Sequence, residues 1–247
     1  MTERIRATAP PATLPLRQRR RVRLVGLGAC AFLGAMAALL LWHVFAEDEL
    51  LQQHIRTLEQ LEQMDPADVR IYSRDGEPKH LHPPPTSWHD EFTEAEQKRL
   101  LIRAALVALR DSNTSFCSFF VPIRRVRFAG PDCSVDVLLG GGNSEFAIGG
   151  DTTTWRNGAE LLHVSFNAYL VSEAPEVKES YWSLQASLQS MISLRKHFPE
   201  RVAHWMDDLR SLAPVVVRIE ANPGRELPDY WQIIGQTREE YIASQGK

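Results

Sequence analysis

One uninterrupted run of apolar residues dominates the pattern of the chain. Residues 24–46 read LVGLGACAFLGAMAALLLWHVFA, which is 23 residues without a charge. At about 1.5 Å per residue, a helix of this length measures roughly 34 Å and can cross a bilayer. Helices inside soluble domains rarely stay apolar on every face for six turns. The pattern therefore predicts a transmembrane helix over residues 24–46.

The charges on the two sides of this run have opposite signs. Acidic residues follow it, and arginines precede it. The flanking residues are Glu47, Asp48 and Glu49 on one side and Arg17, Arg19, Arg20, Arg21 and Arg23 on the other. The positive-inside rule then keeps residues 1–23 in the cytoplasm and exports the C-terminal part. We expect a single-pass signal-anchor protein of the bacterial inner membrane with a periplasmic domain.

Three other interpretations of the N-terminal segment stay open. A cleavable signal peptide would suit the small residues Val44 and Ala46, but the apolar run is longer than such a peptide needs. Residues 27–30 are similar to a lipoprotein cleavage box, although only six apolar residues precede Cys30. An Arg-rich segment with almost no acid is also typical of mitochondrial targeting. The alternative is therefore a subunit of a mitochondrial inner-membrane complex.

Beyond the apolar run, a helical pattern predicts a membrane-proximal stalk over residues 47–65. Leu51, Ile55 and Leu58 recur at helical spacing until Asp65 and Pro66 end the helix. Leu51 and Leu58 are one heptad apart, but two heptads are too few for a coiled coil. We expect the stalk to pack on its own domain, which covers residues 66–247.

The next segments alternate between strand and helix patterns. Residues 69–72 predict a short strand, and a Pro-rich spacer follows at residues 82–85. Thr93 and Glu96 have the spacing of a capping box, which predicts a helix that extends from residue 94 to residue 110.

Residues 116–167 consist of short β-branched and aromatic runs separated by turn residues. The runs are CSFFV, VRF, SVDVLL, EFAI and ELLHVSF, with turns at residues 129–132 and 140–143. This pattern predicts consecutive strands of an antiparallel sheet.

The helical period returns after this region. It predicts helices over residues 176–197, 200–212 and 237–244, and residues 215–220 predict one more strand. Because the strands are consecutive and closely linked, the order favours an α+β fold, with an antiparallel sheet flanked by helices on one face.

Charge separates the N-terminal tail from the rest of the chain. Residues 1–23 carry seven Arg and one Glu, so the remainder carries a net charge of −9, since the whole chain carries −3. An acidic body argues against nucleic acid as a partner. The 44% hydrophobic and 24% charged content excludes a disordered or collagen-like chain.

Two of the three cysteines lie in the part assigned to the periplasm. Cys117 and Cys133 enclose 15 residues, and an oxidising compartment would let them form a disulfide. A single hairpin would place Cys133 opposite Phe128, so pairing requires Pro122 to break the preceding strand. Two buried thiols remain the alternative.

A histidine cluster is the strongest candidate for metal chemistry. His80 and His82 lie two residues apart on an extended segment, so their side chains point the same way. His89, followed by Asp90, could close a metal site. Three histidines in a Pro-rich linker are more often solvated surface residues than metal ligands. We expect no cofactor from any other motif.

Residues 180–194 read SYWSLQASLQSMISL, a predicted helical stretch without charge. No face of such a helix looks fully solvated. It either packs between the sheet and a second helix, or it contacts a partner protein or a second copy. The candidate interaction surface comprises Tyr181, Trp182, Leu184, Ser187, Leu188 and Met191.

Two functions follow from these patterns. The first hypothesis is a non-enzymatic envelope protein that is anchored in the lipid bilayer and belongs to a larger membrane assembly. The second is an envelope enzyme, metal-assisted through the His80, His82 and His89 cluster. No motif identifies a substrate, and Ser193 with Lys196 matches S-x-x-K without the other motifs of that enzyme class.

Overall fold

The computed structural model describes residues 32–36, 49–75, 90–115, 120, 122–141, 144–149, 155–174 and 178–245. The chain divides into two compact units, Met1–Leu51 and Gln52–Lys247. Within the described ranges, no helix has both the length and the apolar character needed to cross a bilayer. Most of the 24–46 segment lies outside these ranges. The transmembrane helix therefore stays a prediction.

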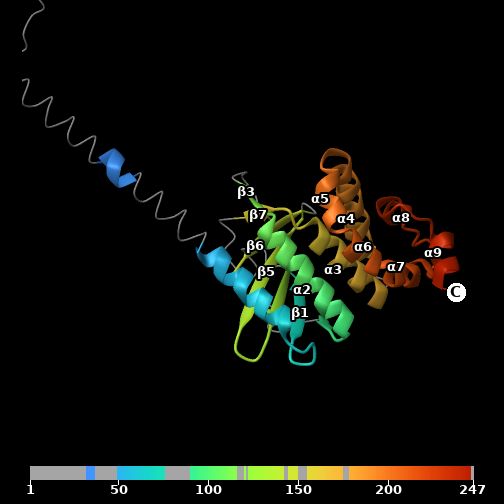
Figure 1. Cartoon of the computed structure of the whole chain (residues 1–247), viewed down its shortest axis with the longest axis horizontal. Coiled ribbons are helices and arrows are strands. Elements are labelled where there is room, and N and C mark those ends of the chain that lie inside the picture. Colours follow the sequence, from blue (N-terminus) through green and yellow to red (C-terminus); the bar gives the residue numbers. More distant parts are fainter. Residues whose placement is uncertain are drawn as a thin grey trace, which may run out of the picture. The chain divides into compact units, whose positions relative to one another are not determined.

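The second unit contains one antiparallel sheet flanked by helices, as the sequence predicts (Figure 1). Seven strands within the described ranges pair in the order β2-β1-β4-β5-β6-β7-β3. Every neighbouring pair is antiparallel. The strands are β1 (Arg70–Asp75), β2 (Asp90–Phe92), β3 (Asn113–Ser115), β4 (Pro122–Ala129), β5 (Ser134–Gly140), β6 (Glu145–Ile148) and β7 (Trp155–Asn157).

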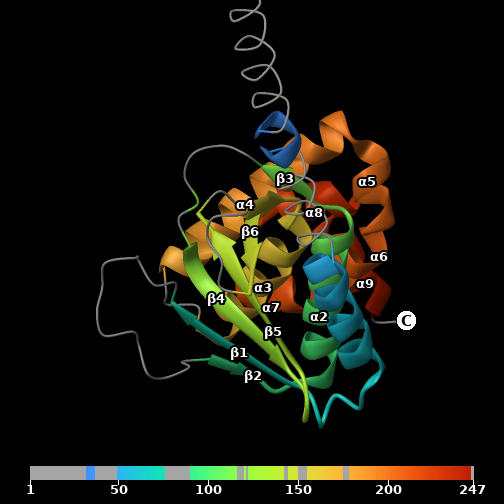
Figure 2. The same cartoon turned by 90° about the vertical axis from the view of Figure 1, so that its left-hand side faces the viewer.

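Alternate residues of the central strands form the core face of the sheet. Val126 and Phe128 of β4 pair with Val137 and Val135 of β5, and all four side chains are buried. Successive side chains of a strand point to opposite faces, so these four lie on one face. Figure 2 shows β1, β4 and β5 in front of the helix that covers this face, which is α3.

Helix α3 (Glu160–Glu173) replaces a strand that the sequence predicts at ELLHVSF, so that prediction is wrong. Its residues from Glu160 to Val171 are all buried. A helix that is buried on every face shows no amphipathic period, and a short apolar run then reads as a buried strand. The Phe166 ring lies 5.5 Å from the Phe92 ring of β2, which anchors α3 on the sheet.

Helix α2 (Ala95–Arg110) confirms the predicted helix, but its start differs from the prediction. The N-cap residue is Glu94, and no side chain caps the helix. The predicted Thr93 capping box is therefore absent.

Residues 49–63 are helical, and part of this helix packs beside α2. Leu58 and Leu61 are buried, and Glu59 forms a 2.6 Å ion pair with Arg110. The part of the predicted stalk within the second unit thus packs on its own domain.

The remaining helices follow α3 in sequence. They are α4 (Lys178–His197), α5 (Pro199–His204), α6 (Met206–Ser211), α7 (Ala213–Glu220), α8 (Pro228–Ile234) and α9 (Arg238–Gln245). The predicted helix over residues 200–212 is interrupted at Trp205, which separates α5 from α6.

Helix α7 replaces the strand predicted over residues 215–220, and that prediction is also wrong. The β-branched run favours a strand, but Val215, Val216 and Ile219 are buried at helical spacing. Pro214 in the first turn also suits a helix start. Packing thus overrides intrinsic propensity here. Helix α9 confirms the predicted C-terminal helix, with a reciprocal cap between Thr237 and Glu240.

Gly158, in the link between β7 and α3, supports a first prediction. Its φ is +124°, and a Cβ there would lie 2.6 Å from Nη2 of Arg201. We expect Gly158→Ala to destabilise the fold by about 2–3 kcal/mol through backbone strain, because L side chains rarely adopt a φ of +124°. Thermal unfolding of the full chain measures the loss.

Gly224→Ala is the matched control. Gly224 also has a positive φ, +73°, but no atom lies within 4 Å of its added Cβ. We expect Gly224→Ala to lower the free energy of unfolding by about 1 kcal/mol. Equal losses for the two variants would contradict the larger backbone strain at Gly158.

Candidate functional site

The inner face of α4 packs against the rest of the domain. Tyr181, Leu184, Leu188 and Met191 are buried, as is Ser187. The hydroxyl of Tyr181 donates a 2.8 Å hydrogen bond to the carbonyl oxygen of Glu226. Five of the six residues of the predicted interaction surface therefore lie inside the domain.

Polar side chains line the contact between α3 and α4. Ser187 Oγ donates to the carbonyl oxygen of Ser183 at 2.7 Å and accepts from Asn167 Nδ2 at 3.5 Å. Asn167 and Ser187 are both buried. Small serine side chains let the two helices approach closely without leaving buried polar atoms unpaired.

A cavity of about 500 Å³ opens where this polar contact meets the sheet. Side chains from β4, β5, α3 and α4 line it. They are Ile123, Arg124, Leu139, His163, Phe166, Asn167, Glu179, Ser180 and Ser183. We call it the α3–α4 cavity. Its volume lies within the range of small-molecule binding sites.

His163 is the buried titratable group of this cavity. Its Nε2 lies 3.1 Å from the carbonyl oxygen of Glu145. A carbonyl oxygen can only accept, so Nε2 carries the hydrogen and Nδ1 is the unprotonated nitrogen. Burial lowers the pKa of His163 to about 4, although the hydrogen bond to the Glu145 carbonyl acts to raise this pKa. The imidazole is therefore neutral at pH 7.

Arg124 supplies positive charge to the same cavity. Its guanidinium lies 5.9 Å from the centre of the Phe166 ring. Because Phe166 is itself packed on Phe92, this aromatic wall is rigid. Negative charge comes from Glu179, an exposed residue in the first turn of α4.

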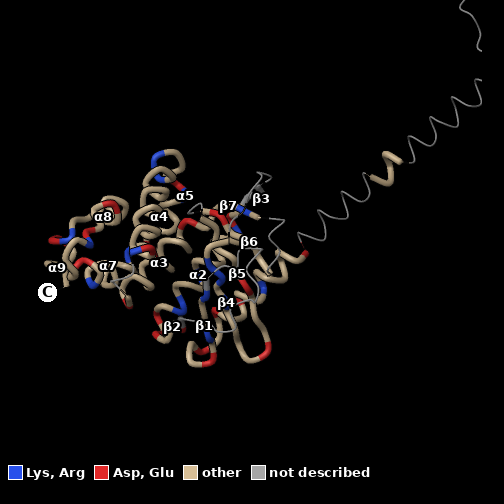
Figure 3. Tube along the Cα trace, turned by 180° about the vertical axis from the view of Figure 1, so that it is seen from behind, with Lys and Arg blue, Asp and Glu red and all other residues tan. Residues whose placement is uncertain are grey.

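The outer face of α4 carries no charge between Glu179 and Arg195. Trp182 is 60% exposed there, and Ala186, Gln189 and Ser193 are exposed at helical spacing. We call these four residues the α4 outer face. In Figure 3, α4 is tan over most of its length. An exposed Trp on an uncharged helix face is typical of a protein contact.

A second, smaller cavity lies at the other end of α4. It measures about 180 Å³, and Glu160, Ser193 and His197 contribute to its lining. Burial raises the pKa of Glu160, and nearby Arg201 opposes this shift. The closest Arg201 nitrogen is 3.9 Å from Glu160 Oε2, beyond hydrogen-bond distance. Within the described ranges, this oxygen has no hydrogen-bond partner.

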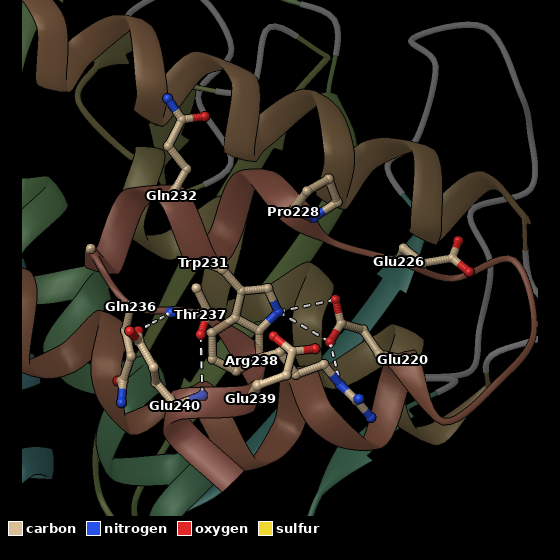
Figure 4. Close-up of a pocket in the computed structure, with 11 residues that line it drawn as sticks. Glu220, Glu226, Pro228, Trp231, Gln232, Gln236, Thr237, Arg238, Glu239 and Glu240 are labelled. Carbon is tan, nitrogen blue, oxygen red and sulfur yellow. Dashed lines mark hydrogen bonds and ion pairs between the residues drawn. The ribbon is translucent and has the colours of Figure 1, made fainter. Parts of the chain in front are cut away.

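The C-terminal helices line a third pocket of about 700 Å³, which is widely open to solvent (Figure 4). The carboxylate of Glu220 accepts hydrogen bonds from Trp231 Nε1 at 3.1 Å and from the Leu227 backbone at 2.8 Å. Arg238 adds an ion pair at 3.1 Å. Glu220 is thus fully used in joining α7, α8 and α9, which is a structural role.

The predicted metal residues His80, His82 and His89 lie outside the described residues. Where the chain is described, no three His, Cys, Asp or Glu residues are grouped to hold a metal ion. Cys133 is partly buried beside the turn between β4 and β5, and Cys117 lies outside the described ranges. The metal site and the disulfide both stay predictions.

Sequence reasoning missed the polar residues of α3. His163 and Asn167 are four residues apart, and Glu160 is three residues before His163. On a helix these spacings share one face, whereas the predicted strand would divide them between two faces. Reading ELLHVSFNAYLV as a buried helix would have revealed this polar face.

Comparisons with protein families, curated proteins and solved structures found no match for the chain.

Ser187→Glu tests the packing of α4 on α3. The new carboxylate would be buried without a partner, so we expect a loss of about 3–5 kcal/mol in unfolding free energy. This loss lowers Tm by roughly 10 °C. Thermal unfolding of the full chain in mild detergent measures it. Ser193→Glu, at an exposed position of the same helix, should change stability by less than about 0.5 kcal/mol. Wild-type stability of Ser187→Glu would contradict the buried contact.

His163 predicts a specific loss of stability in acid. Its pKa is about 4 in the folded chain and 6.5 in the unfolded chain. Between these values only the unfolded state binds the proton, so stability is full above pH 6.5 and falls as pH drops toward 4. The titration of His163 lowers the free energy of unfolding by about 3 kcal/mol across this pH range.

His163→Gln retains a donor to the Glu145 carbonyl and removes the titration. We therefore expect this variant to lose less stability than wild type between pH 6.5 and pH 4. His204→Gln, at an exposed position, is the control and should follow wild type. Thermal unfolding across this pH range compares the three proteins, and parallel curves would exclude the assignment.

Proposed function

We propose that the protein is a single-pass envelope protein whose exported domain binds a partner protein through the α4 outer face. The proposal makes the chain a non-enzymatic component of a larger assembly in the cell inner membrane. The N-terminal tail is cytoplasmic, and the domain is periplasmic. The bilayer holds the domain near its partner.

The exposed Trp182 is the single observation that carries this proposal. It is 60% exposed, although Trp side chains gain much free energy from burial. Trp is also enriched among the residues that dominate binding energy at protein interfaces. Ala186 extends the uncharged surface along the helix, and Gln189, the next residue of this face, donates a hydrogen bond to the Asp229 carboxylate of α8.

The sequence pattern supports the membrane part of the proposal. The 23-residue apolar segment has the length of a membrane span, and the arginines before it favour a cytoplasmic N-terminus. A periplasmic protein held at the membrane meets its partner at a raised effective concentration, so a modest contact area suffices.

Trp182→Glu tests the partner contact. We expect the full-length wild-type protein to copurify with a different protein from native membranes in gentle detergent. Trp182→Glu should reduce this recovery at least tenfold, because it removes an aromatic anchor and introduces a charge. Quantitative mass spectrometry of the purified material measures the ratio of partner to bait.

Ile242→Glu is the matched control. Ile242 is a large apolar side chain on α9 that is 45% exposed, and its replacement should leave recovery unchanged. A wild-type protein that purifies alone would contradict the proposal. A complex that contains only copies of this chain, or equal losses in both variants, would also contradict it.

A further inference from the structure

We propose that the partner of the α4 outer face inserts a lysine side chain into the smaller cavity beside α4, where its ammonium group binds Glu160. This inference rests on the proposed docking contact and specifies the chemistry of the partner. We call the cavity the Glu160 pocket. The residues that line it are Glu160, Ser190, Ser193, Leu194, His197 and Phe198.

The Glu160 pocket adjoins the docking surface. Ser193 belongs to both, because it lines the pocket and is the last residue of the exposed row that begins at Trp182. These two residues lie about 16 Å apart along the helix, which is well within the span of a standard interface. Phe198 continues the surface at the pocket and is 54% exposed. A partner that covers Trp182 therefore reaches the pocket.

Oε2 of Glu160 is an acceptor without a donor. The residue is only 7% exposed, and among the described residues this oxygen has no hydrogen-bond partner. The nearest Arg201 nitrogen lies 3.9 Å away, so Arg201 attracts the carboxylate without donating to Oε2. A buried oxygen that lacks a donor carries a desolvation cost. A donor that enters the pocket removes this cost.

Two contacts hold Arg201 at this distance. Its guanidinium lies 5.1 Å from the centre of the Trp205 ring, and Nη2 donates a 3.4 Å hydrogen bond to the carbonyl oxygen of Asp111. Arg201 would have to give up this arrangement to reach Oε2. A ligand from outside the chain meets no such constraint.

The state of the carboxylate favours an ammonium group over a guanidinium. Glu160 also accepts a hydrogen bond from its own backbone N–H. Since Oε2 has no partner, Oε1 accepts this bond. A guanidinium binds best to both oxygens of a carboxylate, whereas an ammonium group is a compact charge that one oxygen can bind. The single open oxygen therefore suits lysine better than arginine.

The other walls of the pocket suit the rest of a lysine side chain. An ammonium group has three N–H donors, and the hydroxyls of Ser190 and Ser193 can accept from it. Leu194 and Phe198 offer apolar surface to the methylene stem. The Phe198 ring also attracts a cation to its face.

The size of the pocket indicates one side chain rather than a whole ligand. Its volume is about 180 Å³. Small-molecule sites usually measure about 300–1,000 Å³. The neighbouring Arg195 and Lys196 line a different cavity, where Arg195 donates to the carbonyl oxygen of Gln232. Their positive charges are therefore directed away from the Glu160 pocket.

The first test uses n-butylammonium, which has the ammonium group and alkyl stem of lysine. Ligand-observed NMR and thermal shift measure its binding to the full-length protein in mild detergent. We expect saturable binding in the millimolar range, because the probe has few atoms. Tetramethylammonium, 1-butanol and n-propylguanidinium lack the N–H donors, the charge or the compact head group. Each should bind at least fivefold more weakly.

Variants locate this binding. Glu160→Gln should weaken binding of n-butylammonium at least tenfold. Ser190→Leu should abolish it by filling the pocket without changing a charge, so the test does not depend on one variant. Glu239→Gln, at an exposed position on α9, is the matched control and should bind like wild type. The Tm of each variant checks that it folds.

The second test returns to the partner. Glu160→Gln should lower partner recovery from native membranes at least fivefold, and Glu239→Gln should not change it. On immobilised wild-type protein, n-butylammonium should release the partner, whereas tetramethylammonium at the same ionic strength should not.

Three results would overturn the inference. One is no binding of n-butylammonium to the wild-type protein. Another is equal binding of tetramethylammonium or n-propylguanidinium. The last is full partner recovery in Glu160→Gln while Trp182→Glu loses the partner, which leaves the docking contact intact. Failure of the docking proposal itself is recognised separately, because the wild-type protein would then purify alone.

Discussion

The packing of α3 between the sheet and the other helices sets the conditions for its neighbours. Twelve of its fourteen residues are buried, so each polar group on it needs a partner from an adjacent element. His163 finds one in the Glu145 carbonyl of β6, and Asn167 finds one in Ser187 of α4. Strand β6 and helix α4 are therefore tied to α3 by polar contacts as well as by apolar packing.

This constraint explains half of the uncharged stretch of α4. Its inner face meets α3, where an unpaired charge would be costly, so serines and apolar residues occupy it. The same argument does not apply to the outer face. Positions 182 and 186 are exposed, so a charged side chain there would remain hydrated. The packing hypothesis and the contact hypothesis thus concern two faces of one helix and do not compete.

The sequence predicted those elements whose burial is one-sided. Helix α2 has a clear polar face, and α4 has an apolar seam at helical spacing, so periodicity identified both helices. It failed for α3, which has no exposed face, and for α7, where β-branched residues favour a strand. The cavity could not be predicted from the sequence for a further reason. Arg124 and His163 come from separate elements, and only the tertiary fold brings them together.

The position of the cavity follows from the register of the sheet. Along the core face of β4, buried Phe128 and Val126 are followed by the partly buried Arg124. Arg124 pairs with the buried Leu139 of β5, so this row of the sheet places a charged side chain beside apolar ones. A guanidinium that remains charged needs polar surroundings, and α3 and α4 provide them at the same level. The cavity therefore lies where apolar side chains of the sheet meet polar side chains of α3 and α4.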